Sequence, residues 1–212
     1  MNPYMIDVLR RNRYSSGNVS LLRSCLFIHI PKCAGNTIKD SIGGFSQDSH
    51  SMAKEIPIEI FKNFYSFSFV RNPWDRCLSA YYYLSKGGSR NKQDFLDREE
   101  FVINYPNFHD FLVRGGLDRA SEDQIHFKPQ KRFLEHRNFN FIGKVENIEE
   151  DMKTVCKNLD IEYSLPHFNR GIRPSSNIYT TKTADIVADI YREDIEAFQF
   201  EFDTQPTRFV KP

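Results

Sequence analysis

The sequence lacks a long hydrophobic run, an excess of charge of one sign and a cysteine-rich pattern. Its apolar segment at residues 25–30 is too short to span a bilayer. The 29 Lys and Arg residues nearly balance the 28 Asp and Glu residues, for a net charge of +1. No global electrostatic field therefore draws the chain to nucleic acid or to a membrane. We predict no nucleic-acid partner, and no membrane anchor is visible.

The four cysteines have neither the spacing of a metal site nor the density of a disulfide scaffold. We expect Cys25 and Cys156 in the core and Cys33 as a small residue filling a loop. No cluster of His, Cys and carboxylate residues has metal-ligand spacing, so no metal is expected. The simplest compartment for such a chain is a reducing cytoplasm.

The first informative motif is HIPKCAGNT, residues 29–37, which lies between an apolar segment and an expected helix start. Backbone N–H groups at a helix N-terminus bind anions, and Lys32 beside them adds a full positive charge. The lysine precedes the single glycine, so the motif is not the G-x-x-x-x-G-K-[ST] loop of common nucleotide-binding proteins. It predicts a phosphate-binding loop that suits a donor other than ATP.

The second motif is RNPWDRCLSAYY, residues 71–82, where another expected strand runs into a helix. Asn72 suits the N-cap of that helix and Pro73 its first position. Arg71 at the strand end and the Ser79 hydroxyl can converge on a second anion. Two anion sites at neighbouring strand ends predict a ligand that carries two separated phosphate groups.

Together these motifs resemble the donor site of sulfotransferases that use 3′-phosphoadenosine 5′-phosphosulfate (PAPS). HIPKCAGNT is similar to their 5′-phosphosulfate loop. RNPWDRCLSAYY is similar to their 3′-phosphate site, with its Arg and Ser eight residues apart. The pair resembles the carbohydrate branch, which includes heparan sulfate 2-O-, chondroitin and HNK-1 sulfotransferases. Weaker similarities at residues 126–130, 141–151, 166–169 and 191–194 extend the likeness over roughly residues 24–203.

The resemblance implies sulfuryl transfer from PAPS to a hydroxyl group, expected to belong to a carbohydrate, with PAP as the product. Lys32 would reach the bridging oxygen and stabilise charge on the leaving group. Arg71 and Ser79 would hold the 3′-phosphate. Arg170 is a further candidate for the nucleotide or an acidic acceptor, with an ordinary solvated loop as the alternative. The remaining cofactor-binding candidates are the loop residues Cys33, Ala34, Gly35, Asn36 and Thr37.

An acceptor hydroxyl gains from a general base, for which several residues are candidates. His50 lies at a place similar to that of a proposed catalytic histidine in heparan sulfate 2-O-type enzymes. His126, in the HFKPQ segment, is the second candidate, and a carboxylate at Glu122 or Asp123 is the third. The other histidines have structural or surface interpretations: His29 is expected to be structural, and His109 and His136 are expected at the surface.

Strands that alternate with helices predict an α/β protein, a P-loop-like three-layer fold with a central parallel sheet flanked by helices. Residues 1–23 are expected to be an N-terminal extension and residues 24–212 a single domain. Residues 87–105 are charged and predict an irregular loop, a plausible lid or substrate loop. Strands are expected at 24–30, 65–70 and 139–145, and helices at 36–42, 57–63, 73–86, 107–114, 147–159 and 181–198.

Two other classes of function stay open at this point. One is a nucleotide or small-molecule kinase on a P-loop-like fold, which binding of ATP with Mg²⁺ would favour. The other is a non-catalytic module that keeps the nucleotide site. Animal members of the resembled family are anchored Golgi proteins, so the Golgi lumen is the alternative compartment if this sequence is a trimmed piece of an anchored protein.

Overall fold

The computed structural model describes residues 17–46, 49–89, 91–164 and 178–202. The chain forms two compact units. Of the described residues, those up to Arg71 and those from Gln130 to residue 164 make up the first unit, and those from Asn72 to Pro129 and from residue 178 onward make up the second. The chain therefore leaves the first unit after Arg71 and returns to it at Gln130.

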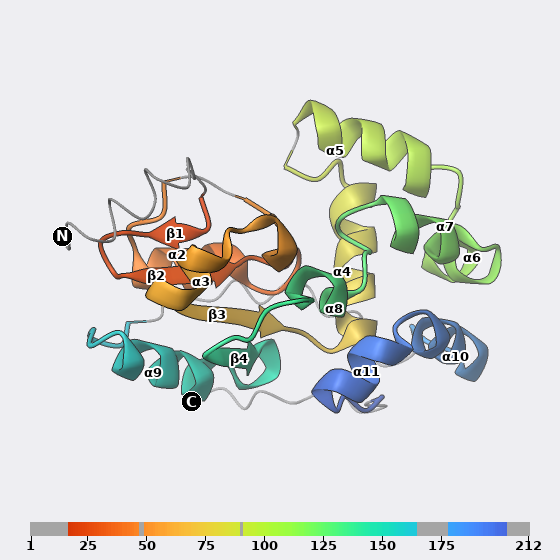
Figure 1. Cartoon of the computed structure of the whole chain (residues 1–212). Coiled ribbons are helices and arrows are strands. Elements are labelled where there is room, and N and C mark those ends of the chain that lie inside the picture. Colours follow the sequence, from red (N-terminus) through yellow and green to blue (C-terminus); the bar gives the residue numbers. More distant parts are fainter. Residues whose placement is uncertain (1–16, 47–48, 90, 165–177, 203–212) are drawn as a thin grey trace. The chain divides into compact units, whose positions relative to one another are not determined.

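A four-stranded sheet lies in the first unit, in the order β1 (Val19–Ser20), β2 (Cys25–Ile28), β3 (Tyr65–Val70) and β4 (Phe141–Lys144) (Figure 1). Strands β2, β3 and β4 are parallel, and β1 is antiparallel at the edge. Because β1 pairs with β2, the sheet begins before residue 24, inside the stretch expected to be an extension.

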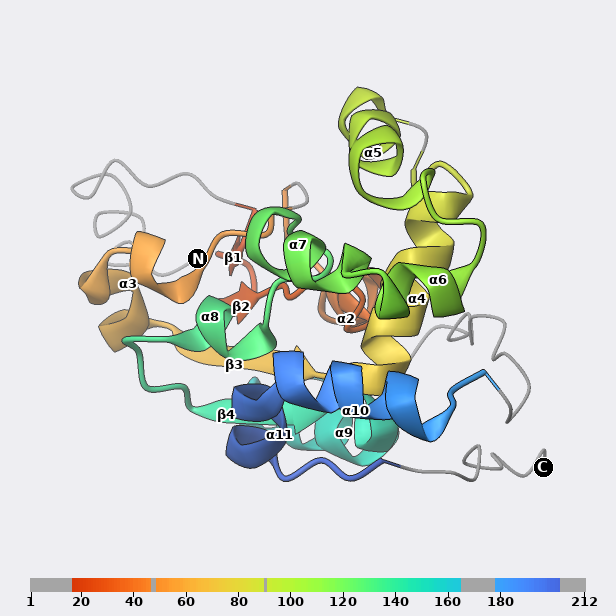
Figure 2. The ribbon, with the colours of Figure 1, turned by 90° about the vertical axis from the view of Figure 1, so that its right-hand side faces the viewer.

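Helices cover both faces of this sheet, as the apolar strands require. Residues of β2 and β3 are buried almost completely, which is typical of parallel strands enclosed on both sides. Figure 2 shows α2 and α9 on one side of the strands and α3 and α8 on the other. The three-layer α/β prediction is confirmed. The helical elements of the unit are α2 (Gly35–Ile42), η1 (Ala53–Glu55), α3 (Ile58–Asn63), α8 (Gln130–Leu134), η3 (Val145–Asn147) and α9 (Ile148–Asn158).

The second unit is helical throughout its described residues. Its core is built largely from aromatic side chains, including Phe111, Phe127 and Tyr191. Trp74 belongs to this core, and its Nε1–H donates to the Ala184 carbonyl at 2.9 Å. The elements are α4 (Pro73–Ser85), α5 (Lys92–Asp97), η2 (Arg98–Val102), α6 (Phe108–Val113), α7 (Gly116–Asp123), α10 (Thr181–Ile190) and α11 (Arg192–Phe198).

The prediction of an irregular loop at residues 87–105 is wrong, because α5 and the π-helix η2 lie there. The Asn91 side chain caps α5 by accepting from the Asp94 N–H at 2.7 Å. Buried Asp94 then accepts hydrogen bonds from the Tyr83 hydroxyl and from the N–H and hydroxyl of Ser89. This cluster, rather than hydrophobic periodicity, orders the charged segment.

Two short helices and one helix break also escaped prediction. Gly115, with φ 77°, follows the expected helix 107–114 and is the N-cap of α7, which was not predicted. Helix α8 was not predicted. The expected helix 181–198 is divided at Tyr191, whose buried hydroxyl donates to the Phe127 carbonyl at 2.6 Å.

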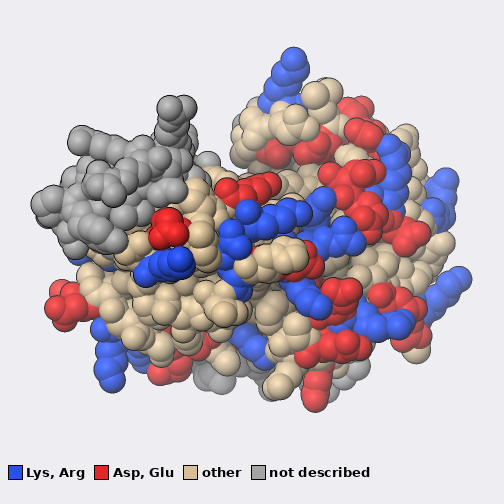
Figure 3. Space-filling view, in the orientation of Figure 1, with Lys and Arg blue, Asp and Glu red and all other residues tan. Residues whose placement is uncertain are grey.

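Charges of both signs are interspersed on the face drawn in Figure 3, in agreement with the small net charge. Among the helices that the structure describes, none has the length and apolar composition needed to cross a membrane.

Candidate functional site

The candidate anion loop is the loop between β2 and α2, residues 29–34. Lys32 and Ala34 both adopt left-handed conformations, with φ values of 68° and 61°. Such conformations are costly for non-glycine residues and cluster at functional sites. Ala34 is the N-cap of α2 and has no side-chain acceptor for the first-turn N–H groups. The turn therefore presents backbone donors beside the half-buried Lys32 side chain.

Gly35 is required at the start of α2 because the His29 ring occupies the space of a side chain. A Cβ atom at Gly35 would lie 1.8 Å from His29 Nε2. His29 is 5% exposed and stacks on Phe27, with ring centroids 5.7 Å apart. His29 thus packs against the start of α2 as a buried side chain, in agreement with its structural interpretation.

His50 packs beside the same loop. Its ring centroid lies 4.4 Å from that of His29, and its Nδ1 atom lies 2.9 Å from the His29 carbonyl oxygen. A carbonyl oxygen only accepts hydrogen bonds, so Nδ1 carries the proton. In the neutral ring this leaves the lone pair on Nε2, which is the form that a general base needs.

Arg71 lies at the end of β3, adjacent to the loop within the first unit. Its Nη1–H donates to the Lys32 carbonyl at 3.4 Å. The backbone N–H of Arg71 donates to Gln130 Oε1 at 2.8 Å, and Gln130 Nε2–H donates back to the Arg71 carbonyl at 2.8 Å. The two sequence motifs are therefore brought together through Lys32 and Arg71.

Ser79 lies on α4, in the second unit. Asp75 and Ser79 are half-buried and one turn apart, whereas Trp74, Leu78 and Ala80 of the same helix are buried. Its participation with Arg71 in one phosphate site stays a prediction.

His126 also lies in the second unit, in a different environment from His50. Its Nε2 atom lies 3.6 Å from Asp94 Oδ1, its ring packs against Tyr83 with centroids 4.9 Å apart, and its Nδ1 atom is buried. Burial raises the pKa of Asp94, but hydrogen bonds from Tyr83 and Ser89 and the charge of His126 outweigh it, so the pKa lies below its usual value. Neither ring nitrogen of His126 is thus directed to solvent.

The family model described as "Sulfotransferase family" matches residues 22–201. The chain belongs to the sulfotransferase family. Membership indicates an enzyme that transfers a sulfuryl group to a hydroxyl-bearing acceptor. No curated protein matches the sequence significantly.

Gln130 is the residue of this sulfotransferase that sequence reasoning missed as part of the site. In the sequence it is only the last residue of the HFKPQ segment, and its 0% exposure is visible only in the structure. Of the remaining candidates, Glu122 and Asp123 are exposed at the end of α7. Arg170, like the similarity at residues 166–169, lies outside the described residues.

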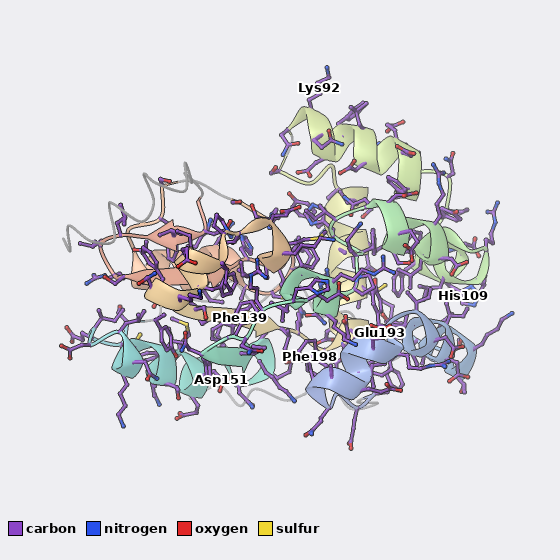
Figure 4. All side chains as sticks on the ribbon, viewed as in Figure 1. Lys92, His109, Phe139, Asp151, Glu193 and Phe198 are labelled. Carbon is purple, nitrogen blue, oxygen red and sulfur yellow. The ribbon has the colours of Figure 1, made fainter. Side chains whose placement is uncertain are left out.

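The other predictions for the sulfotransferase concern cysteines, surface histidines and metals. Cys25 and Cys156 are buried, as expected, and Cys33 in the loop before α2 is buried as well. His109, which Figure 4 labels on α6, and His136 are exposed, so their surface interpretation is confirmed. Across the described ranges, no group of three or more His, Cys, Asp or Glu residues is arranged to hold a metal ion.

Proposed function

We propose that this sulfotransferase moves the sulfuryl group of PAPS to a carbohydrate hydroxyl. One observation carries the proposal: the left-handed turn at Lys32 and Ala34 opens α2, and the guanidinium of Arg71 lies 3.4 Å from the carbonyl of Lys32. Cationic groups and backbone donors thus gather around one loop, as a doubly phosphorylated nucleotide requires.

The donor site follows from this arrangement. The N–H groups at Gly35, Asn36 and Thr37, with the Thr37 hydroxyl, would hold the 5′-phosphate. Lys32 would contact the bridging oxygen. Arg71, with Ser79, would bind the 3′-phosphate, since a guanidinium offers paired donors to a phosphate. Cys33 and Ala34 would contribute backbone to the same loop.

The reaction is an exchange of one S–O bond for another. The acceptor oxygen bonds to sulfur while the bond from sulfur to the bridging phosphate oxygen breaks, and PAP leaves. Lys32 stabilises the charge that develops on that oxygen. The acceptor proton passes to a base, for which His50 is the first choice because the hydrogen bond from its Nδ1–H to the His29 carbonyl puts the lone pair of the neutral ring on Nε2.

His126 and the carboxylates Glu122 and Asp123 are lower-ranked bases. Both nitrogens of His126 are turned inward, with Nε2 facing Asp94. Arg170 remains a candidate for the nucleotide or for an acidic acceptor. No metal is required by this scheme, because Lys32 and the loop donors supply the positive charge.

The test is a transfer assay with labelled PAPS over glycans, glycolipids, tyrosyl peptides and small alcohols, with calorimetry of PAP in the absence of metal. We expect label on a glycan and micromolar or tighter PAP binding. Label only on peptides or alcohols would refute the carbohydrate assignment. Binding of ATP with Mg²⁺ in preference to PAP would refute PAPS as the donor and favour the kinase alternative.

A further inference from the structure

Gln130 is the first residue of α8, and its side chain is fully buried in the first unit at 0% exposure. Burying a primary amide without partners is costly, and this amide is engaged at both ends. Its Oε1 accepts from the N–H of Arg71 at 2.8 Å and from Cys33 Sγ at 3.3 Å, while its Nε2–H donates to the Arg71 carbonyl at 2.8 Å.

The amide pairs with Arg71 as a neighbouring strand would, by satisfying both the N–H and the C=O of one residue. It does so where β3 has just ended at Val70 and the regular ladder no longer continues. The third contact reaches Cys33, between the two left-handed residues of the anion loop. One side chain therefore connects the end of β3 to the loop before α2.

We propose that Gln130 is a positioning residue that sets the distance between the 5′-phosphate loop and Arg71. This role rests on the proposed function, in which those two segments hold the two phosphates of one nucleotide. A ligand that binds through two linked groups gains affinity only while its two sites keep the matching separation. Loss of Gln130 should therefore harm the two-phosphate ligand more than either single-phosphate ligand.

The first experiment compares the affinities of PAP, adenosine 5′-phosphate and adenosine 3′-phosphate by calorimetry. Gln130→Met keeps a similar side-chain length and removes all three hydrogen bonds. We expect it to lower the preference for PAP over each monophosphate by about tenfold or more, the scale of losing buried hydrogen bonds. The matched control is Gln124→Met in the second unit, since Gln124 is also buried and its amide bonds the Asp97 carboxylate and the His126 N–H. The control should leave the preference unchanged.

The second experiment uses Gln130→Glu, which also serves if Gln130→Met fails to fold. A protonated glutamic acid can replace the amide, because its O–H donates to the Arg71 carbonyl and its C=O accepts from the N–H. The ionised form has no donor and faces that carbonyl. Burial raises the pKa of such a carboxyl, so the neutral form, and with it the preference for PAP, should return as pH falls. The wild-type preference, measured in parallel, corrects for titration of the phosphates.

These experiments distinguish a failure of the proposed function from a failure of the positioning role of Gln130. Wild-type protein that does not bind PAP would refute the proposed function, and the positioning role with it. Wild-type protein that binds PAP, with Gln130→Met weakening all three nucleotides equally, would overturn the positioning role alone. In Gln130→Glu, a PAP preference equal to that of wild type at a pH where infrared spectroscopy shows the introduced carboxyl to be ionised would overturn it as well.

Discussion

Because Gly35 lies against the His29 ring, we predict that the effect of Gly35→Ala on stability depends on whether His29 is present. An added Cβ at Gly35 would lie 1.8 Å from His29 Nε2 and 1.9 Å from Cδ2. Ordinary van der Waals contact begins at 3.4 Å, so the ring or the helix must move by about 3.4 − 1.8 = 1.6 Å. Overpacking of this kind costs about 1–3 kcal/mol or more, so Gly35→Ala should destabilise the protein.

With the ring removed, the same substitution should have the opposite effect. Gly35 is the first residue of α2 and has no positive φ, and alanine in place of glycine at a compatible backbone position stabilises by about 0.4–1 kcal/mol through the unfolded state. In a His29→Ala background, Gly35→Ala should therefore be neutral or stabilising. Urea denaturation of the four proteins without ligand measures both effects as a double-mutant cycle. Equal destabilisation in both backgrounds would refute the idea that position 35 requires glycine because the His29 ring occupies the space of a side chain.

Four further predictions concern charged and titratable groups. Lys32→Ala should lower turnover at least about 100-fold while donor binding suffers less; near-normal turnover in steady-state assays would contradict its role. Arg71→Ala should weaken the binding of PAP by about 1.5–3 kcal/mol per charged hydrogen bond, far more than it weakens the binding of adenosine 5′-phosphosulfate. Equal losses of affinity for the two ligands in calorimetry would contradict the assignment of Arg71 to the 3′-phosphate site. His50→Ala should keep the affinity for PAP but slow turnover by about 100- to 10,000-fold. His126→Ala is the paired control. The opposite pattern would transfer the role of base to His126, and two active variants would leave Glu122 or Asp123 as the candidate. The pKa of Asp94 is lowered in the folded state, so its contribution to stability is present above the usual value of 3.8 and is lost as pH falls below it. Asp94→Asn should therefore remove this fall of the unfolding free energy at acid pH. An unchanged fall in the variant would contradict the role of Asp94.

Local sequence patterns were sufficient for the elements that surround the site. The apolar segments at β2 and β3 and the Asn72-Pro73 helix start were placed within a few residues, because strand burial and helix capping are decided by neighbours in the chain. The sequence also predicted that Lys32 and Arg71 lie near each other, since each follows an apolar strand at the edge where parallel strands present ligands, and the structure places the Arg71 guanidinium at the Lys32 carbonyl. The helices in segment 87–105 were not predicted, because hydrogen bonds to a buried carboxylate order this segment and hydrophobic periodicity does not reveal such a cluster.

By itself, then, the sequence determined the sulfotransferase motifs, the α/β class and the strand-to-helix turns that carry the charged residues. The tertiary structure decided which side chains support those turns. Gln130 reaches Arg71 across 59 residues and Cys33 across 97, and His50 joins His29 across 21. The physical reason is that capping and periodicity act over one or two turns of chain, whereas these contacts exist only after the sheet has brought distant segments to the same edge.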